Sequence, residues 1–111
     1  MLKIQTCEKI AREFEGCVES PHFEKKSFRV NKKIFLTLDD KNNRAVVKLS
    51  PVEQSVFCAF DPKAVYPSSG AWGKQGWTVV ELSFVKKDLV QDIIKSSYCN
   101  VAPFVLSAKY K

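Results

Sequence analysis

The segment SFRVNKKIFLTL, residues 27–38, decides the fold, because it predicts two short strands joined by a turn. Ser27–Val30 and Ile34–Leu38 are rich in β-branched and aromatic residues, and Asn31-Lys32-Lys33 between them is typical of a turn. Strands this close in sequence pair antiparallel, because parallel strands need a crossover of about a dozen or more residues. The segment therefore predicts an antiparallel hairpin.

Two registers are open for this hairpin. A two-residue turn would place Phe28 opposite Phe35. A three-residue loop would instead place Phe28 opposite Leu36, and Val30 opposite Ile34. We expect the three-residue loop, because it collects the apolar side chains on one face. The opposite face would then carry Arg29, Phe35 and Thr37.

Apolar spacing predicts three helices. The first lies over residues 4–14 and ends near Gly16. The second starts at Ser50-Pro51-Val52-Glu53, where Ser50 and Glu53 form a capping box around a proline at the first helical position. Its expected apolar face consists of Val52, Val56, Ala59 and Phe60. The third helix runs from about Lys87 to Tyr98.

The remaining segments complete the order of elements. Ser20-Pro21-His22 predicts a loop, and Arg44–Leu49 predicts a third strand. Trp77–Leu82 predicts a further strand, with a segment around Ala71–Gly73 as its hairpin partner. The order is helix, three strands, helix, two strands, helix. It predicts one α+β domain over residues 1–111, an antiparallel sheet with helices packed on one face.

The composition favours anionic partners. The chain has 111 residues, with 18 basic and 12 acidic side chains, a net charge of +6 and a pI near 9.2. The length fits one domain. A positive field of this size attracts DNA or an acidic protein, although a few surplus lysines can also serve solubility alone.

The cysteines and the N-terminal residues indicate the cellular compartment that we expect for the protein. Cys7, Cys17, Cys58 and Cys99 form no Cys-x-x-Cys pair, so no zinc site is expected. Residues 1–5 turn polar at once and lack the apolar stretch of a signal peptide, and no apolar run is long enough to span a membrane. We expect reduced thiols in a cytoplasmic protein without a cofactor or membrane contact, and we favour a monomer.

Several segments, in order along nearly the whole chain, resemble the MmcQ/YjbR family: Phe28-Arg29-Val30, Lys33-Ile34-Phe35, Lys48-Leu49-Ser50-Pro51, Gly70–Thr78, and Tyr98 followed by Val101-Ala102-Pro103. The stretch with the tryptophans and glycines is the most specific. The resemblance implies an α+β domain with an antiparallel sheet. It also implies a DNA-binding protein with a "double-wing" motif, and it brings no catalytic residues with it.

Seven residues are candidates for nucleic-acid contact: Arg29, Lys32, Lys33, Phe35, Lys48, Trp72 and Lys74. In the expected register Arg29 and Lys48 share a sheet face with Phe35, and Lys32-Lys33 lie at the hairpin tip. Such a tip would lie along a phosphate backbone, and the aromatic rings would stack on bases. The alternative is a solvated face whose lysines protect sheet edges, with Trp77 in the core and Trp72 anchoring its loop.

Two functions from different classes remain open. The first is nucleic-acid binding through the hairpin tip and the sheet face. The alternative is a protein-interaction or adaptor module that uses an exposed sheet face or edge. We expect no enzymatic activity, because His22 is the single histidine and no acid, base and nucleophile can be assembled.

Overall fold

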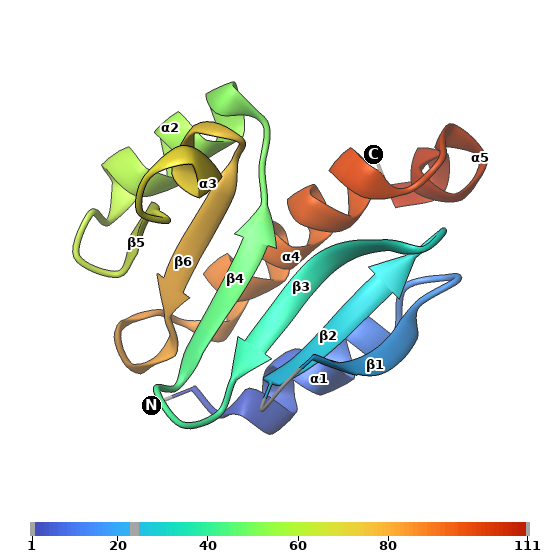
Figure 1. The fold of residues 1–111 in the computed structure, drawn as a ribbon, viewed down its shortest axis with the longest axis horizontal. Coiled ribbons are helices and arrows are strands. Elements are labelled where there is room, and N and C mark those ends of the chain that lie inside the picture. Colours follow the sequence, from blue (N-terminus) through green and yellow to red (C-terminus); the bar gives the residue numbers. More distant parts are fainter. Residues whose placement is uncertain (1, 23–24, 111) are drawn as a thin grey trace.

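A computed structural model describes residues 2–22 and 25–110 of the chain, apart from the side chain of His22. Six strands form one sheet in the order β1-β2-β3-β4-β6-β5, and every neighbouring pair is antiparallel (Figure 1). The strands are β1 (Val18–His22), β2 (Lys25–Val30), β3 (Lys33–Asp39), β4 (Arg44–Lys48), β5 (Val65–Pro67) and β6 (Trp77–Glu81). The helices are α1 (Ile4–Arg12), α2 (Pro51–Phe60), α3 (Ala71–Lys74), α4 (Lys87–Val101) and α5 (Phe104–Ser107), with 3-10 turns η1 (Leu82–Phe84) and η2 (Ala108–Tyr110).

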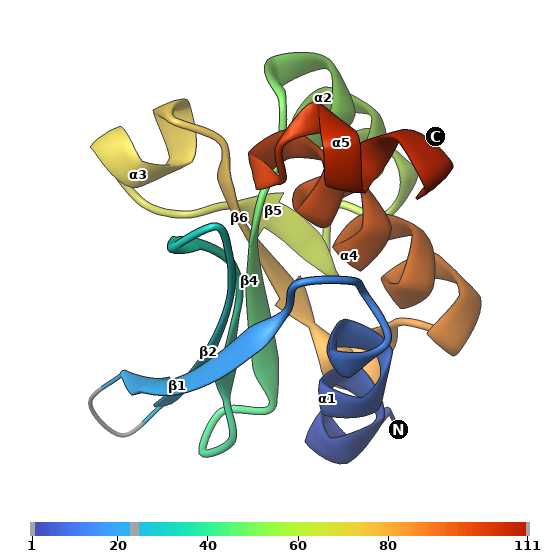
Figure 2. The same ribbon diagram turned by 90° about the vertical axis from the view of Figure 1, so that its right-hand side faces the viewer.

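The helices lie unequally on the two sides of the sheet. Figure 2 shows α1, α4 and α5 on one side, whereas α3 projects on the other. The predicted α+β class and antiparallel sheet are therefore confirmed, and the long helices do pack on one face. We call the sheet face away from α1 and α4 the open face.

The core lies between the sheet and the helices α1 and α4. Alternating strand residues point into it, as the period of two along a strand requires. They are fully or almost fully buried: Phe28, Val30, Leu36, Leu38, Ala45, Val47, Thr78 and Val80. Helix α4 contributes Val90, Ile93, Ile94 and Tyr98, and α1 contributes Ile4, Cys7, Ile10 and Ala11. The open face therefore carries the intervening residues of each strand.

The β2–β3 hairpin combines the two registers that the sequence left open. Its turn has two residues, Asn31 and Lys32, with φ of 50° and 69°, the backbone of a type I′ turn. Val30 consequently pairs with Lys33, so the expected pairing of Val30 with Ile34 is wrong. The register then shifts, and the expected pairing of Phe28 with Leu36 is present.

A β-bulge at Phe35 produces this shift. Arg29 pairs with Ile34 and Phe28 with Leu36, which leaves Phe35 as the extra residue on β3. The bulge turns Phe35 into the core, where its side chain is 0% exposed and packs edge-on against Tyr98. The expectation that Phe35 lies on the opposite face to Leu36 is therefore wrong.

Ser97 of α4 closes the sheet ladder where the bulge opens it. Its hydroxyl donates to the carbonyl oxygen of Phe35 and accepts from the backbone N–H of Lys48 at 2.8 Å. The side chain thus satisfies one group on β3 and one on β4 that would otherwise be buried without a partner. Sheet and helix are joined at this point by a buried polar bridge.

Two predicted segments have a different structure. Ser20-Pro21-His22 belongs to β1, an edge strand, where a proline is tolerated because one side of the strand needs no hydrogen bond. Ala71–Lys74 is the short helix α3, and the strand that pairs with β6 is β5. Glycines and a tryptophan in a turn-rich segment did not distinguish a helical turn from a strand.

Helix α2 begins as predicted but packs differently. Both hydrogen bonds of the capping box between Ser50 and Glu53 are present. The expected apolar face, however, points to solvent: Val52 is 72%, Val56 60% and Phe60 75% exposed. The partly buried residues are instead Phe57 and Cys58.

Candidate nucleic-acid interface

The open face contains a hollow of about 440 Å³ between α3 and the strands β2, β3, β4 and β6. It is lined by Lys25, Ile34, Thr37, Val46, Ser68, Ser69, Trp72 and Trp77. The sheet contributes Ile34, Val46 and Trp77 as an apolar floor, together with Thr37. Ser68, Ser69 and Trp72 come from α3 and the segment that precedes it. This composition suits a ligand with a flat apolar face and polar edges.

Close backbone approaches and side-chain hydrogen bonds hold α3 in place above the hollow. A Cβ on Gly73 would lie 2.0 Å from the carbonyl oxygen of Ser68, and one on Gly76 would lie 2.1 Å from that of Leu49. Gln54 of α2 donates to the carbonyl oxygen of Gly73 and to the hydroxyl of Thr78, each at 3.0 Å. The glycines are therefore required for close approach, and α3 is fixed to the sheet rather than loosely tethered.

The acidic residues Glu81 and Asp39 lie on the open face, at the end of the sheet away from α3, and each forms an ion pair with a basic side chain. Arg44 donates from Nε to both carboxylate oxygens of Glu81 at 3.0 and 2.9 Å, and Tyr66 donates its hydroxyl hydrogen to the same group. Burial opposes the charge of Glu81, but these hydrogen bonds outweigh it and lower the pKa of the carboxyl group. Lys25 lies 3.9 Å from Asp39.

Cations at the other end of the open face have no acidic partner. Within residues 2–22 and 25–110, neither Arg29 nor Lys48 makes an ion pair. The Nε of Arg29 is buried and has no hydrogen-bond partner. The Nζ of Lys48 lies 5.1 Å from the centroid of the Trp77 ring. This end of the face therefore carries positive charge that no acidic side chain in the described ranges neutralises.

The structure brings together only part of the predicted set. Arg29, Lys48 and Trp72 lie on the open face or beside its hollow. Lys32 is at the exposed tip of the hairpin. Lys33 pairs with Val30, and paired residues project to the same side of a sheet, so it lies on the helix-covered side.

The other two candidates do not line the hollow. Lys74 is exposed on α3, two residues from Trp72, and residues two apart do not share a helix face. It flanks the hollow instead. Phe35 is in the core and is no surface contact. The basic face is therefore smaller than the sequence suggested.

Trp72 is the one lining residue among the sequence candidates, and sequence reasoning missed the other seven: Lys25, Ile34, Thr37, Val46, Ser68, Ser69 and Trp77. Lys25 was missed because β2 starts two residues before the predicted strand. A signal existed for Trp77, since it lies at alternate positions with the charged Glu81 and so shares a strand face with it, away from the core. Nothing in the sequence placed Ser68 and Ser69 beside the sheet.

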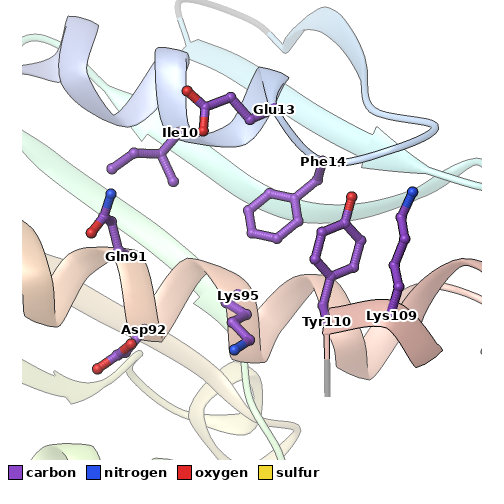
Figure 3. Close-up of a pocket in the computed structure, with 8 residues that line it drawn as sticks. All are labelled: Ile10, Glu13, Phe14, Gln91, Asp92, Lys95, Lys109 and Tyr110. Carbon is purple, nitrogen blue, oxygen red and sulfur yellow. The ribbon is translucent and has the colours of Figure 1, made fainter.

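A second hollow, of about 470 Å³, lies on the helix side between α1, α4 and η2 (Figure 3). Its lining carries charges of both signs, with Glu13 and Asp92 as well as Lys95 and Lys109. Lys109 already pairs with Glu15, which follows α1, at 3.3 Å. The mixed charge gives this hollow no preference for a polyanion, so we place the candidate interface on the open face.

Thiols and metal ligands do not form a site in the described part of the chain. Burial raises the pKa of the Cys7 thiol to about 12 and also raises the pKa of Cys17 and Cys58, which disfavours the thiolate at each. Among residues 2–22 and 25–110, no group of three or more His, Cys, Asp or Glu side chains could hold a metal ion. The side chain of His22 and the whole of Glu24 lie outside the described residues. No helix in the described ranges is long and apolar enough to cross a membrane.

The fold is that of an α+β protein with a six-stranded antiparallel sheet, helices on one face and a hollow lined by tryptophans, aliphatic side chains and hydroxyl groups on the other. A family model, described as YjbR, matches residues 12–100. The chain belongs to the YjbR family, as the resemblance of its segments predicts. Comparison with curated proteins finds no match.

Among solved structures, the chain is similar to Deinococcus radiodurans protein DR2400, which carries a DUF419 domain. The TM-score is 0.79 at 19% sequence identity, and the alignment covers 91% of this chain and 79% of that chain. At this identity the likeness establishes the fold alone.

Proposed function

We propose that the open face binds nucleic acid, with DNA as the first polymer to test. The observation that carries the proposal is the segregation of charge on this face. Glu81 and Asp39 are paired at one end, whereas Arg29 and Lys48 at the other end have no acidic partner in the described chain. A phosphate backbone supplies the missing anions.

The physical driving force is the release of condensed counterions. Each phosphate that a cation neutralises returns counterions to solution, so affinity falls steeply with salt. Arg29 lies on β2, and Lys48 lies on β4 beyond the intervening β3. They can therefore contact different phosphates of one backbone, and Lys32 at the hairpin tip extends this line. Such contacts fix orientation without reading sequence, so little sequence preference is expected.

The experiment is a salt titration of binding to a labelled DNA oligonucleotide, followed by fluorescence anisotropy. The variants Arg29→Ala and Lys48→Ala should weaken binding and reduce the slope of log K against log salt by about 0.7 to 0.9 for each phosphate that is no longer neutralised. The matched control is Lys9→Ala, which removes the same charge from exposed α1 on the helix side. Absence of binding at low salt, or equal weakening in all three variants, would reject the proposal.

A second candidate function is protein interaction, and the exposed stripe on α2 favours it. Val52, Val56 and Phe60 are spaced four residues apart and so lie on one helix face, although all three are exposed. Phe60 also lines a hollow of about 430 Å³ with Phe84 and Leu89. Exposed apolar patches of this kind are typical of interaction surfaces.

A pull-down from lysate, carried out with and without nuclease treatment, distinguishes the two functions. Retention of one partner by the wild-type protein and its absence with Phe60→Ser would support protein interaction. The open-face variant Lys48→Ala serves as the control, since it leaves α2 unchanged. Recovery that depends on Lys48 and disappears with nuclease would support nucleic-acid binding instead.

A further inference from the structure

We propose that the open face takes an unpaired nucleic-acid strand, with a base stacked on Trp72 above the hollow. This inference rests on the proposed function, because it concerns the form of nucleic acid that the same face receives. Three features carry it: the exposure of Trp72, the rigidity of its support and the shape of the hollow.

Trp72 is exposed although it is one of the two largest side chains of the chain. Its side chain is 64% exposed, and the core does not use it. A surface tryptophan leaves most of its apolar area in water, so the residue contributes little to folding. The segment Gly70–Gly76 nevertheless holds it at one place above the sheet.

The backbone around Trp72 is held by hydrogen bonds within α3 and by contacts of the neighbouring Gly73. The backbone N–H of Gln75 donates to the carbonyl oxygens of Ala71 and Trp72, each at 3.1 Å. The adjacent Gly73 lies in contact with Ser68, and the side chain of Gln54 donates to its carbonyl oxygen. An aromatic ring whose backbone is fixed before binding loses little entropy when a ligand stacks on it.

The hollow next to Trp72 has the dimensions and groups for a base with its sugar and phosphate. Its volume is about 440 Å³, its floor is apolar, and the hydroxyl groups of Ser68, Ser69 and Thr37 are part of its lining. Lys48, beside Trp77, provides a cation at its margin, whereas Lys25 of the lining pairs with Asp39. Hydroxyl groups can accept from or donate to any base, which agrees with weak sequence preference.

An unpaired strand fits these features better than a duplex. In a duplex the faces of the bases are covered by their neighbours, and only the edges are accessible in the grooves. A duplex would therefore leave Trp72 and the apolar floor without a ligand. A single strand presents its base faces, and stacking on aromatic side chains is the usual source of its affinity.

The position of the lysines supports the same choice. A wider basic face, with Lys33 and Lys74 beside Lys48, would suit the two phosphate backbones of a duplex. Lys33 instead lies on the helix-covered side of the hairpin, and Lys74 does not share a helix face with Trp72. Arg29 and Lys48, which make no ion pair within the described ranges, instead lie on β2 and β4 of the open face itself.

The test compares a labelled oligothymidylate with a blunt duplex of equal length, at one low salt concentration, by fluorescence anisotropy. We expect the single strand to bind more tightly. Trp72→Ala should weaken this binding about 5- to 150-fold, the range that corresponds to removal of one base–aromatic stack. Trp72→Phe should retain most of the affinity, because a phenyl ring still stacks.

The matched control is Phe60→Ala, which removes another largely exposed aromatic side chain from α2. It should leave single-strand affinity unchanged, and urea unfolding should show that all variants are folded. Duplex binding that equals or exceeds single-strand binding, with no effect of Trp72→Ala, would overturn this inference and leave the proposed function standing. Failure to bind either form would overturn both.

Discussion

The ammonium group of Lys48 lies 5.1 Å from the centroid of the Trp77 ring, and the two residues are direct partners in the β4–β6 pairing. The ring therefore orients the cation on the open face without neutralising it. A cation–π contact at a partly exposed site contributes about 0.5–1 kcal/mol. The charge of Lys48 remains available for a phosphate.

Lys48→Met tests whether this lysine serves binding rather than folding. Methionine keeps an apolar stem of similar length over the indole and removes the charge. We expect the free energy of unfolding to fall by less than about 1 kcal/mol, while the salt dependence of oligonucleotide binding becomes shallower. Urea unfolding and anisotropy titration measure the two effects. A decrease in stability above about 2 kcal/mol would show that Lys48 is mainly structural.

Arg29→Met is expected to leave stability unchanged or to raise it. The buried Nε of Arg29 has no hydrogen-bond partner among the described residues, and an unmade buried hydrogen bond costs about 1–3 kcal/mol. Methionine removes that donor and fills a similar volume. The same variant should bind DNA more weakly, because it removes a positive charge that would neutralise a phosphate. A strong decrease in stability together with unchanged binding would contradict a binding role for Arg29.

Ser97→Ala is expected to lower the free energy of unfolding by about 1–3 kcal/mol. The substitution removes the hydroxyl that donates to Phe35 and accepts from the N–H of Lys48, and it leaves two backbone groups buried without a partner. Urea denaturation measures the change. Ser96→Ala, at a half-buried position on the same helix, is the control and should stay within about 0.5 kcal/mol of the wild type. Equal effects of both would show that the bridge has no special role.

Glu81→Gln should make stability less sensitive to acid. Despite burial, the hydrogen bonds from Arg44 and Tyr66 lower the pKa of Glu81 from its ordinary value of 4.5. A group whose pKa is lower in the folded state stabilises the protein above its unfolded pKa, and this contribution disappears as the pH falls through the folded pKa. The stability difference between wild type and variant should therefore shrink between about pH 6 and pH 3.

Unfolding in urea at several pH values measures this difference. Tyr66→Phe removes one of the hydrogen bonds to Glu81 and should shift the acid response in the same direction, but less. A difference that stays constant or grows in acid would exclude a contribution from the charge of Glu81.

The elements with strong local signals could be predicted from the sequence. The capping box at Ser50 and Glu53 predicted the start of α2, and Arg44–Leu49 was recognisable as the strand that forms β4. The paired strands around residues 27–38 were also recognisable. In each case the information lies within a few neighbouring residues.

The features that could not be predicted depend on contacts distant in sequence. The bulge at Phe35 is stabilised by Ser97, which is 62 positions away, so uniform registers were the only ones considered. Strand β1 contains a proline and forms through its pairing with β2. The exposure of Val56 and Phe60 likewise follows from where α2 lies against β5, which the apolar pattern alone does not reveal.

For the candidate site, the sequence indicated the right residue types but not their grouping. Arg29, Lys48 and Trp72 share the open face because strand alternation and the position of α3 bring them there. Lys33 was assigned to the same surface because both lysines of the turn were treated as one tip. The two-residue turn separates Lys32 from Lys33 and sends Lys33 to the other side.

Whether the open face binds nucleic acid is tested most directly by an NMR titration of the isotope-labelled protein with an oligonucleotide. We expect shift changes to concentrate on the open face, at the backbone amides of Arg29, Val46 and Lys48 and at the indole N–H groups of Trp72 and Trp77. Changes centred instead on α2, or on the hollow between α1 and α4, would show that the binding surface lies elsewhere.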